Sequence, residues 1–474
     1  MIRPFVAWVV VWSAIIVLAI YALVNAYYLI VHAVSLLELR QNVQERRVNP
    51  SHQPFESPFL PGIAIIIPAF NEAQTIRNTV RSSLDQSYPN TRVIVVNDGS
   101  TDATLQVLQS AFDLSVVDES PPWDLNCEPI EGIFQSESIP NLMVIDKQNG
   151  GKSDALNAGI WLTNQDLFCA IDADSLIDKD GLWHAVIPFL NDPTRTKASG
   201  GTVRVANGCS FTGSQVTDVR VSKRLLVGLQ EVEYLRAFYS GRLGLSRLGS
   251  LLVISGTFGL FRTDAVRTIG GYSRSTVTED LDLVVRLHRH MLQQDVDYQI
   301  SFVPEPVVWT QVPETAKDLS TQRRRWYRGL LETATNHRDM IGNPTFGMLG
   351  TVAIPLYLLS EGIGPLVETY GYIIVPIAFL LGIVDVSFFI TFLLLIIGIG
   401  SLLTFFSLIS EVWGYQQYRR PSQIGLLIGY AILENFGYRQ WKAITAFRGL
   451  VDFFQDRPSW GVIERHPFDE EPSE

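Results

Sequence analysis

The 474-residue sequence has only three cysteines, Cys127, Cys169 and Cys209, at wide and unrelated spacings. An odd number so spaced forms neither a disulfide framework nor a zinc site, and we expect reduced thiols, as in cytosolic chemistry. A basic excess is also missing, because 37 Lys and Arg against 48 Asp and Glu give a formal net charge of −11. This balance argues against a general affinity for nucleic acid or anionic lipid, so any anion should bind at a local site.

Apolar residues, by contrast, make up 47% of the chain, and the mean hydropathy is +0.17. Both values are high for a soluble protein and predict a membrane protein. A nearly uncharged segment from Phe5 to about Val34 exceeds the roughly 20 residues that a membrane-crossing helix needs. It is too long for a cleaved signal peptide and has no small-residue cleavage pattern, so residues 1–37 are predicted to be a transmembrane helix.

Positive charge follows this helix at Arg40, Arg46 and Arg47. By the positive-inside rule, a linker over 38–60 and the domain after it should lie in the cytoplasm. Between 61 and 343 charges return and apolar runs shorten. "GIAIIIPAF", "TRVIVVNDGS", "NLMVIDK" and "LFCAIDADS" are typical of buried strands, separated by helical stretches such as Glu72–Leu84 and Thr101–Phe112.

This alternation predicts an α/β domain with a mostly parallel sheet, in which ligands gather at the carboxyl ends of the strands. Asn71, Asp98, Asp172 and Asp174 should lie at that edge. The stretch Asp113–Pro140 is interpreted as an irregular insertion without an assigned role.

Residues 344–436 are apolar again, with candidate membrane or interfacial helices at Leu349–Leu366, Thr369–Val384, Phe388–Ile409 and Gly425–Leu433. The first carries Glu361 and the last is short, so either can lie in the interface instead of crossing it. Residues 437–474 are expected to be a cytoplasmic amphipathic helix followed by an acidic tail. No internal repeat is evident.

Several short motifs could carry chemistry, although each alone is also compatible with a polar turn. Asp98 in "NDGS" follows a strand and could hold a ribose or a base edge. Asp172 and Asp174 in "DAD" could jointly ligate a divalent cation, since Mg²⁺ prefers oxygen ligands together with substrate phosphates. In "KQNGGKSDALNAGI", Lys147 and Lys152 flank two glycines, and such a turn lets an anion approach backbone and ammonium closely. Its spacing is not that of a Walker A loop.

Two further motifs follow later in the chain. Thr278 precedes Glu279 and Asp280 at the start of an apolar-periodic run, which favours a helix capped by Thr278 with acids in its first turn. "STQRRRWYRG" supplies Gln322, Arg325 and Trp326 together with Arg323, Arg324 and Arg328. The last three arginines could equally be anchors at a membrane surface. His288 and His290 lie two apart on a helix, which points them in different directions and argues against a shared metal.

The order of these motifs, NDGS, D-A-D, T-E-D and Q-x-x-R-W, bracketed by apolar helices, resembles the processive inverting family 2 glycosyltransferases. These include the synthases of cellulose, hyaluronan, chitin and bacterial poly-N-acetylglucosamine. The resemblance covers about Pro61 to Gly329 and is greatest to the poly-N-acetylglucosamine and hyaluronan type, through "NGGKSDALNAG", "LQEVEYLRAFYSGR" and "ISGTFGLFRTDAVRTIGGY". Asn97 departs from the pattern, because many relatives carry a second Asp there.

The resemblance implies a GT-A fold flanked by transmembrane helices, a UDP-sugar donor, and Mg²⁺ or Mn²⁺ as cofactor. It implies the following roles. The catalytic residues are Asp280, as the general base, and Glu279, which holds the loop or approaches the acceptor. The nucleotide-sugar site contains Pro68, Asn71, Glu72, Asp98, Lys147, Lys152, Asp172, Gln322, Arg325 and Trp326. The metal site is Asp172 and Asp174, and the acceptor site is Ser255, Gly256 and Phe258.

We therefore predict a multi-pass enzyme of a bacterial inner membrane that elongates a polysaccharide from a UDP-sugar, with UDP-N-acetylglucosamine as first candidate, and extrudes it through its own helices. Its partners would be the donor, the growing glycan or a lipid acceptor, the bilayer, and accessory export or modification proteins. A non-processive transferase that glycosylates a lipid and an inactive membrane-anchored nucleotide-binding subunit remain as alternatives. The sugar stays open, because selectivity depends on pocket contacts that short motifs do not record.

Overall fold

A computed structural model describes residues 2–48, 60–117, 127–212, 215–380, 382–414, 417–418 and 420–455. The chain divides into two compact units. The helical unit comprises residues 1–41, 223–250 and 313–462, and the sheet unit comprises 42–222, 251–312 and 463–474. The predicted domain over 61–343 is thus shared between them. Its segments 223–250 and 313–343 are largely helical and cluster with the other helices of the helical unit.

The described part of the sheet unit contains a ten-stranded mixed sheet with strand order β3-β4-β5-β2-β1-β6-β11-β8-β12-β7, and a separate hairpin of β9 and β10. The strands are β1 (Ile63–Ala69), β2 (Thr91–Asp98), β3 (Leu114–Val116), β4 (Ile130–Ser136), β5 (Leu142–Lys147), β6 (Leu167–Ile171), β7 (Ser175–Ile177), β8 (Thr196–Val205), β9 (Ser210–Thr212), β10 (Gln215–Asp218), β11 (Phe258–Arg262) and β12 (Gln299–Thr310).

The centre of the sheet is parallel, as the alternation of strands and helices predicts. Strands β5, β2, β1 and β6 run in one direction, while β11 is antiparallel to both of its neighbours. Strand β1 shows why, because Ile63 to Ile67 are all fully buried. A strand covered on both faces needs a continuous apolar run, and each such side chain contributes about 1.5–3 kcal/mol by leaving water.

The interpretation of Asp113–Pro140 as wholly irregular was wrong. Strands β3 and β4 pair antiparallel with each other, and β4 pairs antiparallel with β5 at the edge of the sheet. Both strands are only partly buried, so their sequences lack the continuous apolar run that marks the central strands. Residues 118–126 of this stretch lie outside the described ranges.

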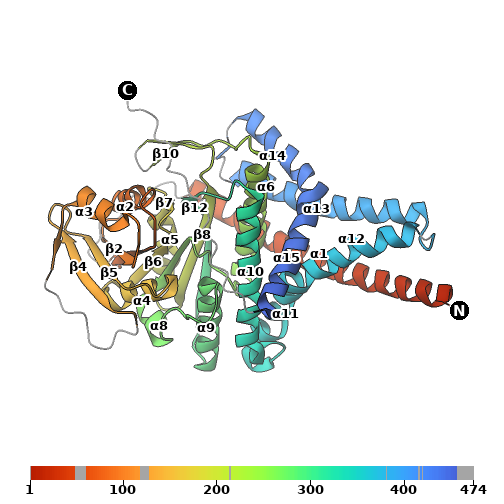
Figure 1. Ribbon diagram of the computed structural model, residues 1–474, viewed down its shortest axis with the longest axis horizontal. Helices are drawn as coiled ribbons and strands as arrows, with labels where there is room; N and C mark the ends of the chain where they lie inside the picture. Colours follow the sequence, from red (N-terminus) through yellow and green to blue (C-terminus); the bar gives the residue numbers. More distant parts are fainter. Residues whose placement is uncertain are drawn as a thin grey trace. The chain divides into compact units, whose positions relative to one another are not determined.

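Helices pack against this sheet in the usual α/β manner (Figure 1). Helix α4 lies against β1 and β2, α5 against β8 and β12, and α2 against β7. Gly159 permits the close approach of α4, since a Cβ at this position would collide with Ile66. The helices of the sheet unit are α2 (Ile76–Leu84), α3 (Thr104–Phe112), α4 (Lys152–Leu162), α5 (Gly181–Asn191), α8 (Thr263–Thr268) and α9 (Glu279–Gln293).

The helical unit is built from apolar helices together with a long polar one, α10, and short π-helical or 3₁₀ turns between some of them. They are α1 (Ile2–Val48), α6 (Leu225–Leu235), α7 (Leu243–Arg247), α10 (Ala316–Asn336), α11 (Ile354–Tyr357), α12 (Gly364–Leu380), α13 (Val386–Gly414), α14 (Pro421–Leu433) and α15 (Arg439–Phe454). Helix α15 packs against α10 and α12. It confirms the helix expected after residue 437, while the acidic tail lies outside the described residues.

Two stretches of the described residues are long and apolar enough to cross a membrane, Val11–Gln44 and Leu349–Leu380. Two details differ from expectation. Helix α1 continues to Val48, so much of the predicted linker over 38–60 is helical, and the candidate spans Leu349–Leu366 and Thr369–Val384 merge into one helical stretch. Helix α14 has 13 residues, or about 20 Å at 1.5 Å per residue, which is short of a bilayer core.

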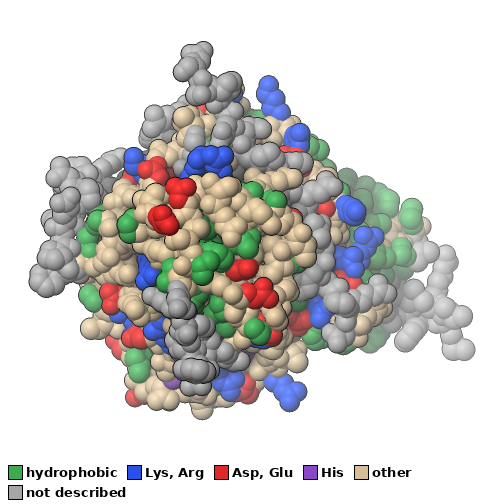
Figure 2. All heavy atoms as spheres, turned by 60° about the vertical axis from the view of Figure 1, so that its left-hand side comes forward, with side chains coloured by type: hydrophobic (Ala, Val, Ile, Leu, Met, Phe, Trp, Pro, Cys, Tyr) green, Lys and Arg blue, Asp and Glu red, His purple; other side chains and the backbone are tan. Residues whose placement is uncertain are grey.

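On the face of the sheet unit drawn in Figure 2, acidic and basic side chains lie interspersed in small groups. On this face (Figure 2), electrostatic attraction for a ligand would come from a local cluster of charges and not from one large patch. The carboxyl ends of the central strands contain such a cluster.

Candidate active site

Polar side chains end four neighbouring parallel strands. Along β5, β2, β1 and β6 they are Lys147, Asp98, Asn71 and Asp172. Strand β11 runs the other way and pairs Phe258 with Ile171, so the residues before Phe258 lie beside the residues after Ile171. The sequence prediction that these strand ends share one edge of the sheet is confirmed.

Asn71 links the loop after β1 to the loop after β2. It has a positive φ of 57°, and its Oδ1 accepts hydrogen bonds from the backbone N–H of Thr101 at 2.8 Å and of Asp102 at 3.2 Å. The neighbouring Glu72 donates its N–H to Thr104 Oγ1, and its carboxylate accepts from Thr75 Oγ1. Both residues thus set the shape of the loop after β1, which begins just beyond the half-buried Pro68.

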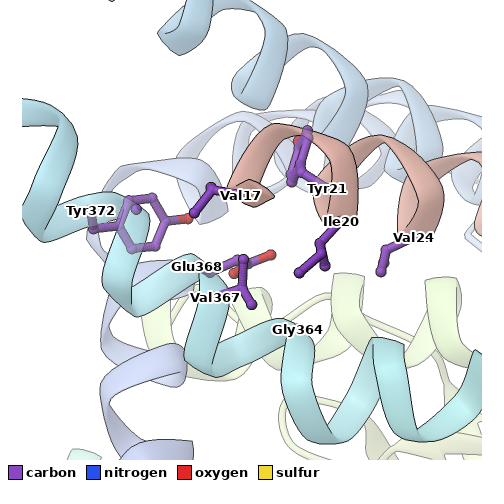
Figure 3. A pocket seen from close by; sticks show the side chains of 9 residues that line it. Val17, Ile20, Tyr21, Val24, Gly364, Val367, Glu368 and Tyr372 are labelled. Atoms are coloured by element: carbon purple, nitrogen blue, oxygen red, sulfur yellow. The ribbon is translucent and has the colours of Figure 1, made fainter. Parts of the chain in front are cut away.

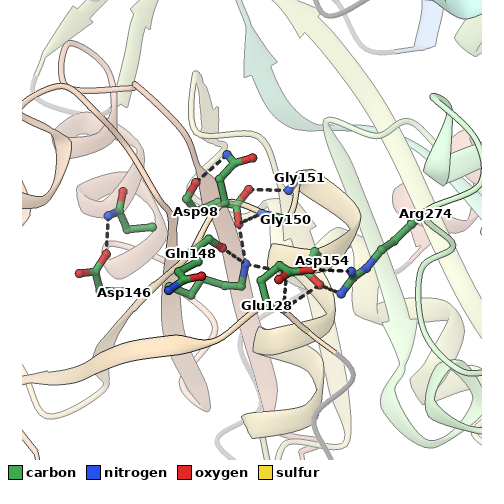
Figure 4. A network of polar contacts seen from close by, with 11 residues as sticks. Asp98, Glu128, Asp146, Gln148, Gly150, Gly151, Asp154 and Arg274 are labelled. Carbon is green, nitrogen blue, oxygen red and sulfur yellow. Dashed lines mark hydrogen bonds and ion pairs between the residues drawn. The ribbon is translucent and has the colours of Figure 1, made fainter. Parts of the chain in front are cut away.

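Asp98 and Lys147 are buried below the loops at this edge of the sheet and are not exposed at it. The side chain of Lys147 is fully buried, and its ammonium contacts Asp98 Oδ1 at 2.7 Å and Asp154 Oδ2 at 2.5 Å. The Asp98 carboxylate also accepts from the N–H groups of Gly150 at 3.0 Å and Gly151 at 2.7 Å (Figure 4). The double-glycine turn therefore binds an anion, as expected, but this anion is the protein's own Asp98.

Lys152, at the start of α4, is the cation that reaches the acidic motifs. Its Nζ lies 2.6 Å from Asp172 Oδ1 and 2.9 Å from Glu279 Oε1, and it donates to the carbonyl of Gly256 at 3.3 Å. Burial alone would lower the pKa of this ammonium, but the two carboxylates outweigh burial and hold the pKa above its usual range. Lys152 is therefore a permanent positive charge that joins the D-A-D to the T-E-D.

Asp280 lies in the same cluster. A Cβ added to Gly256 would stand 3.2 Å from Asp280 Oδ2 and 3.4 Å from Lys152 Nζ, so the Asp280 carboxylate and the Lys152 ammonium both lie close against Gly256. Asp280 Oδ1 accepts the N–H of Leu281 at 2.9 Å. Helix α9 begins at Glu279, immediately after Thr278, as predicted. However, the Thr278 side chain makes no capping hydrogen bond, and its hydroxyl faces that of Thr276 at 3.4 Å.

The three predicted acceptor residues lie at the start of β11. Phe258 is fully buried in the sheet, whereas Ser255 and Gly256 are half-buried in the loop before it. Backbone hydrogen bonding from the Phe258 N–H to the Ser255 carbonyl at 3.1 Å makes this loop a tight turn. Of the three, only Ser255 and Gly256 are in a position to face a ligand.

The D-A-D supplies two carboxylates and, among the described residues, no group of three or more potential ligand side chains surrounds a common point. Asp172 is half-buried and paired with Lys152, and Asp174 is buried and accepts from Ser175 Oγ at 3.2 Å. Mg²⁺ commonly takes only one or two carboxylates and completes its shell with water and substrate phosphates. The two residues fit a metal ion that arrives with a nucleotide diphosphate.

Gln322, Arg325 and Trp326 lie on α10 in the helical unit, where Trp326 is 38% exposed. Arg323 lies over the Trp326 ring, 4.4 Å from its centroid. Within the described residues, the buried Gln322 Oε1 has no hydrogen-bond partner.

The other arginines of α10 are tied by ion pairs that the sequence does not reveal. Arg323 binds Glu233 of α6 through two hydrogen bonds, and Arg324 binds Asp452 of α15 in the same way. Burial would raise the pKa of Glu233, but Arg323 and Lys442 outweigh burial and hold it well below its usual range. Arg328 is likewise paired, with Glu332 at 2.6 Å, and whether these three arginines also anchor the protein at a membrane surface stays a prediction.

An apolar cavity lies elsewhere in the helical unit, between α1 and α12 (Figure 3). Val17, Ile20 and Val24 line it from α1, and Glu368 and Tyr372 from α12. It contains none of the predicted site residues.

In the sheet unit, His288 is buried with Nδ1 at 2.6 Å from Tyr298 Oη and Nε2 at 2.8 Å from the Leu251 carbonyl, so both nitrogens are engaged within the core.

Comparison with known proteins agrees with this geometry. Residues 64–270 match the model of the glycosyl transferase family 2. The chain is 28% identical over 283 residues to a poly-beta-1,6-N-acetyl-D-glucosamine synthase of Staphylococcus epidermidis, covering 60% of this chain and 56% of that one. It is also 28% identical over 301 residues to the synthase of Staphylococcus aureus strain COL, covering 63% and 60%.

The chain thus spans less than two thirds of the length of these relatives. A solved mannosyltransferase from Pyrobaculum calidifontis, in complex with GDP-mannose and Mn²⁺, is similar in fold, with a TM-score of 0.52 at 16% identity over 92% of this chain and 99% of that one. The expected GT-A fold and the resemblance to family 2 are confirmed.

Proposed function

We propose that this chain, a glycosyltransferase whose residues 64–270 match the family 2 model, elongates a polysaccharide from a UDP-sugar, with UDP-N-acetylglucosamine as the first candidate donor. The observation that carries the proposal is the convergence of Asp172, Glu279 and Asp280 on Lys152 and Gly256 at the carboxyl edge of the sheet. The names of the staphylococcal relatives support the polymer and the sugar.

In the proposed reaction Asp280 is the base. A hydroxyl of the acceptor attacks the anomeric carbon of the donor sugar from the face opposite the diphosphate, and Asp280 takes the hydroxyl proton as the new bond forms. The bond between the anomeric carbon and the phosphate oxygen breaks, and its electron pair leaves with UDP. One carboxylate suffices, because inversion requires no covalent intermediate. The acceptor hydroxyl would approach Asp280 from the side of the loop that contains Ser255 and Gly256.

The departing diphosphate gains negative charge, which needs nearby cations. Lys152 is one, since its ammonium lies at the D-A-D and stays charged at all physiological pH values. Mg²⁺ or Mn²⁺ held by Asp172 and Asp174 would supply further neutralisation of the same charge. Glu279, paired with Lys152 at 2.9 Å, orients the ammonium. The assignment of Gln322, Arg325 and Trp326 to the donor and the nascent chain stays a prediction.

The apolar helices suggest where the product goes. Val11–Gln44 and Leu349–Leu380 are the segments suited to cross a membrane, and we propose that the catalytic residues face the cytoplasm, where UDP-sugars would be available. The growing glycan would then leave through the helices of the same chain.

The test is to incubate membranes containing the full chain with a panel of UDP-sugars and either Mg²⁺ or Mn²⁺, and to measure the length of the product. A long polymer from one UDP-sugar is the expected result. A single sugar on a product extractable into organic solvent would establish lipid glycosylation instead. UDP binding without any transfer would indicate an inactive nucleotide-binding subunit.

A further inference from the structure

Arg274 lies in the loop that leads into the T-E-D motif, six residues before Asp280, and the proposed roles leave it unused. Its side chain is 41% exposed, yet its guanidinium makes two ion pairs with acids from other parts of the sheet unit. Nη1 lies 3.2 Å from Glu128 Oε1, just before β4, and Nη2 contacts Asp154 Oδ1 in the first turn of α4. A partly exposed arginine can be hydrated by water without ion pairs. The two ion pairs of Arg274 therefore suggest a structural role.

Asp154 connects Arg274 to the nucleotide side of the site. Its carboxylate is fully buried and contacts Lys147 Nζ through Oδ2 and Arg274 through Oδ1, and Lys147 in turn contacts Asp98 (Figure 4). The backbone N–H of Glu128 donates to Asp154 Oδ2 at 3.1 Å. The result is a row of alternating charges, Asp98, Lys147, Asp154 and Arg274, from the end of β2 to the loop before α9.

The alternation of charge matters because two members of the row, Lys147 and Asp154, have no access to water. Buried charges are tolerated when each is paired, and removing one partner leaves its neighbour uncompensated. Gly150 is part of this arrangement, since a Cβ there would overlap the Asp154 carboxylate. Arg274 occupies the exposed end of the row, so its removal alters the pairing of Asp154 without opening the core.

Two other side chains of α4 hold the same loop at its ends. Asn157 makes hydrogen bonds with both backbone polar groups of Tyr272, at 2.7 and 2.9 Å, and Lys152 pairs with Glu279. Between these points Arg274 makes ion pairs with Glu128 and Asp154, which lie outside the loop. A loop fixed at its ends and its middle holds the first turn of α9, and with it Asp280, in one position.

We propose that Arg274 is a positioning residue for Asp280. Its contacts, through Asp154 and Lys147, fix the position of Asp280 relative to Asp98 at the end of β2. The proposal rests on the proposed function, since it takes Asp280 as the base. It assigns no contact between Arg274 and the substrate. Without the ion pairs of Arg274 the loop can move relative to α4. Displacements of about 1 Å in a catalytic group can reduce the reaction rate a hundredfold.

The experiment measures kcat and KM for UDP-N-acetylglucosamine with the purified full chain and its variants. Arg274→Gln is expected to lower kcat about ten- to a hundredfold with KM changed less than about twofold, and Arg274→Lys to recover part of kcat. Arg195→Gln is the matched control. Arg195 is 45% exposed and also pairs with two acids, Asp192 and Asp297, but it precedes β8 at the opposite edge of the sheet.

Amide hydrogen exchange over residues 272–280 supplies a readout that does not depend on turnover. Faster exchange in this segment alone is expected for Arg274→Gln. If that variant is poorly folded, Glu128→Gln removes the weaker anchor and is expected to lower kcat less than about threefold with the same local change in exchange. Unchanged kcat in Arg274→Gln would overturn the proposal. So would an equal loss of kcat in Arg274→Gln and Arg274→Lys that is accompanied by weaker UDP binding. A wild-type chain that transfers no sugar would overturn the proposed function instead, and the exchange data would still test the contacts of Arg274.

Discussion

Asn157 of α4 binds the backbone of Tyr272 on both sides, with Oδ1 accepting the Tyr272 N–H at 2.7 Å and Nδ2 donating to the Tyr272 carbonyl at 2.9 Å. Both residues are buried. A Cβ at Gly271 would collide with the Asn157 side chain, so glycine is needed for this approach. The amide supplies both the donor and the acceptor that these two backbone groups require.

Replacing Asn157 with Ala is expected to lower the free energy of unfolding by about 2–4 kcal/mol, because it leaves one buried N–H and one buried carbonyl without partners. Thermal denaturation of the purified chain checks this. Asn90→Ala, which removes an exposed side chain with one long bond to the Leu60 carbonyl, should change stability by less than about 0.5 kcal/mol. Equal effects of the two substitutions would show that the Asn157 contacts do not hold the loop.

Asp280→Asn is expected to reduce kcat at least about a hundredfold, because the amide cannot accept the acceptor proton. Its affinity for UDP should stay within about twofold of the wild type, since the change lies on the acceptor side. Asp264→Asn is a matched control, as Asp264 also lies in a first helical turn and accepts the N–H of the next residue, at 2.6 Å. Unchanged turnover in Asp280→Asn would refute the assignment of the base.

Lys152→Gln is expected to strengthen the binding of Mn²⁺ to the nucleotide-free chain by about threefold or more, or roughly 0.7 kcal/mol. The reason is that the Lys152 ammonium lies 2.6 Å from Asp172 Oδ1 and competes with any cation for that oxygen. Titration calorimetry with Mn²⁺ alone measures the change. Lys179→Gln, which removes an exposed lysine between Asp178 and Asp180, should leave Mn²⁺ binding unaltered. Weaker binding in Lys152→Gln would show that Lys152 supports the metal site.

The sequence was sufficient to predict the central strands and the edge that they share. Each of those strands is a continuous apolar run ending in a polar residue, and the parallel arrangement follows from the intervening helices. The assignment of Glu279 and Asp280 to the same site as Asp172 came from the resemblance to the family 2 transferases. It worked because each motif occupies a strand end or a helix start, and those positions are fixed by the fold.

The partners of the buried charges could not be predicted in this way. Asp154 follows Lys152 in the first turn of α4, where an acid is already explained by the helix dipole, and nothing nearby in the sequence indicates Arg274, 120 positions later. Lys147 was expected to face the nucleotide because a lysine beside glycines often binds phosphate. Its full burial between Asp98 and Asp154 depends on which strands are neighbours, and that is a property of the tertiary structure.

His288 makes the stability of the sheet unit depend on pH. Burial lowers the pKa of this imidazole to about 4, which the hydrogen bond to the Leu251 carbonyl only partly opposes. The folded state therefore binds the proton less readily than the unfolded chain, whose histidine titrates near the usual 6.5. The contribution of neutral His288 is fully present above about pH 6.5 and is lost as the pH falls towards 4, a loss on the order of 3 kcal/mol.

Thermal midpoints of the wild type and of His288→Gln between pH 7.5 and 4 test this dependence. The variant should be less stable at pH 7.5, because Gln does not reproduce both the Tyr298 and the Leu251 contacts. The gap should narrow as the pH falls from 6.5 to 4, since only the wild type loses the contribution of a neutral imidazole. His290→Gln, on the same helix but only partly buried, is the control variant. If the His288→Gln gap stays constant, the buried imidazole titrates with an ordinary pKa.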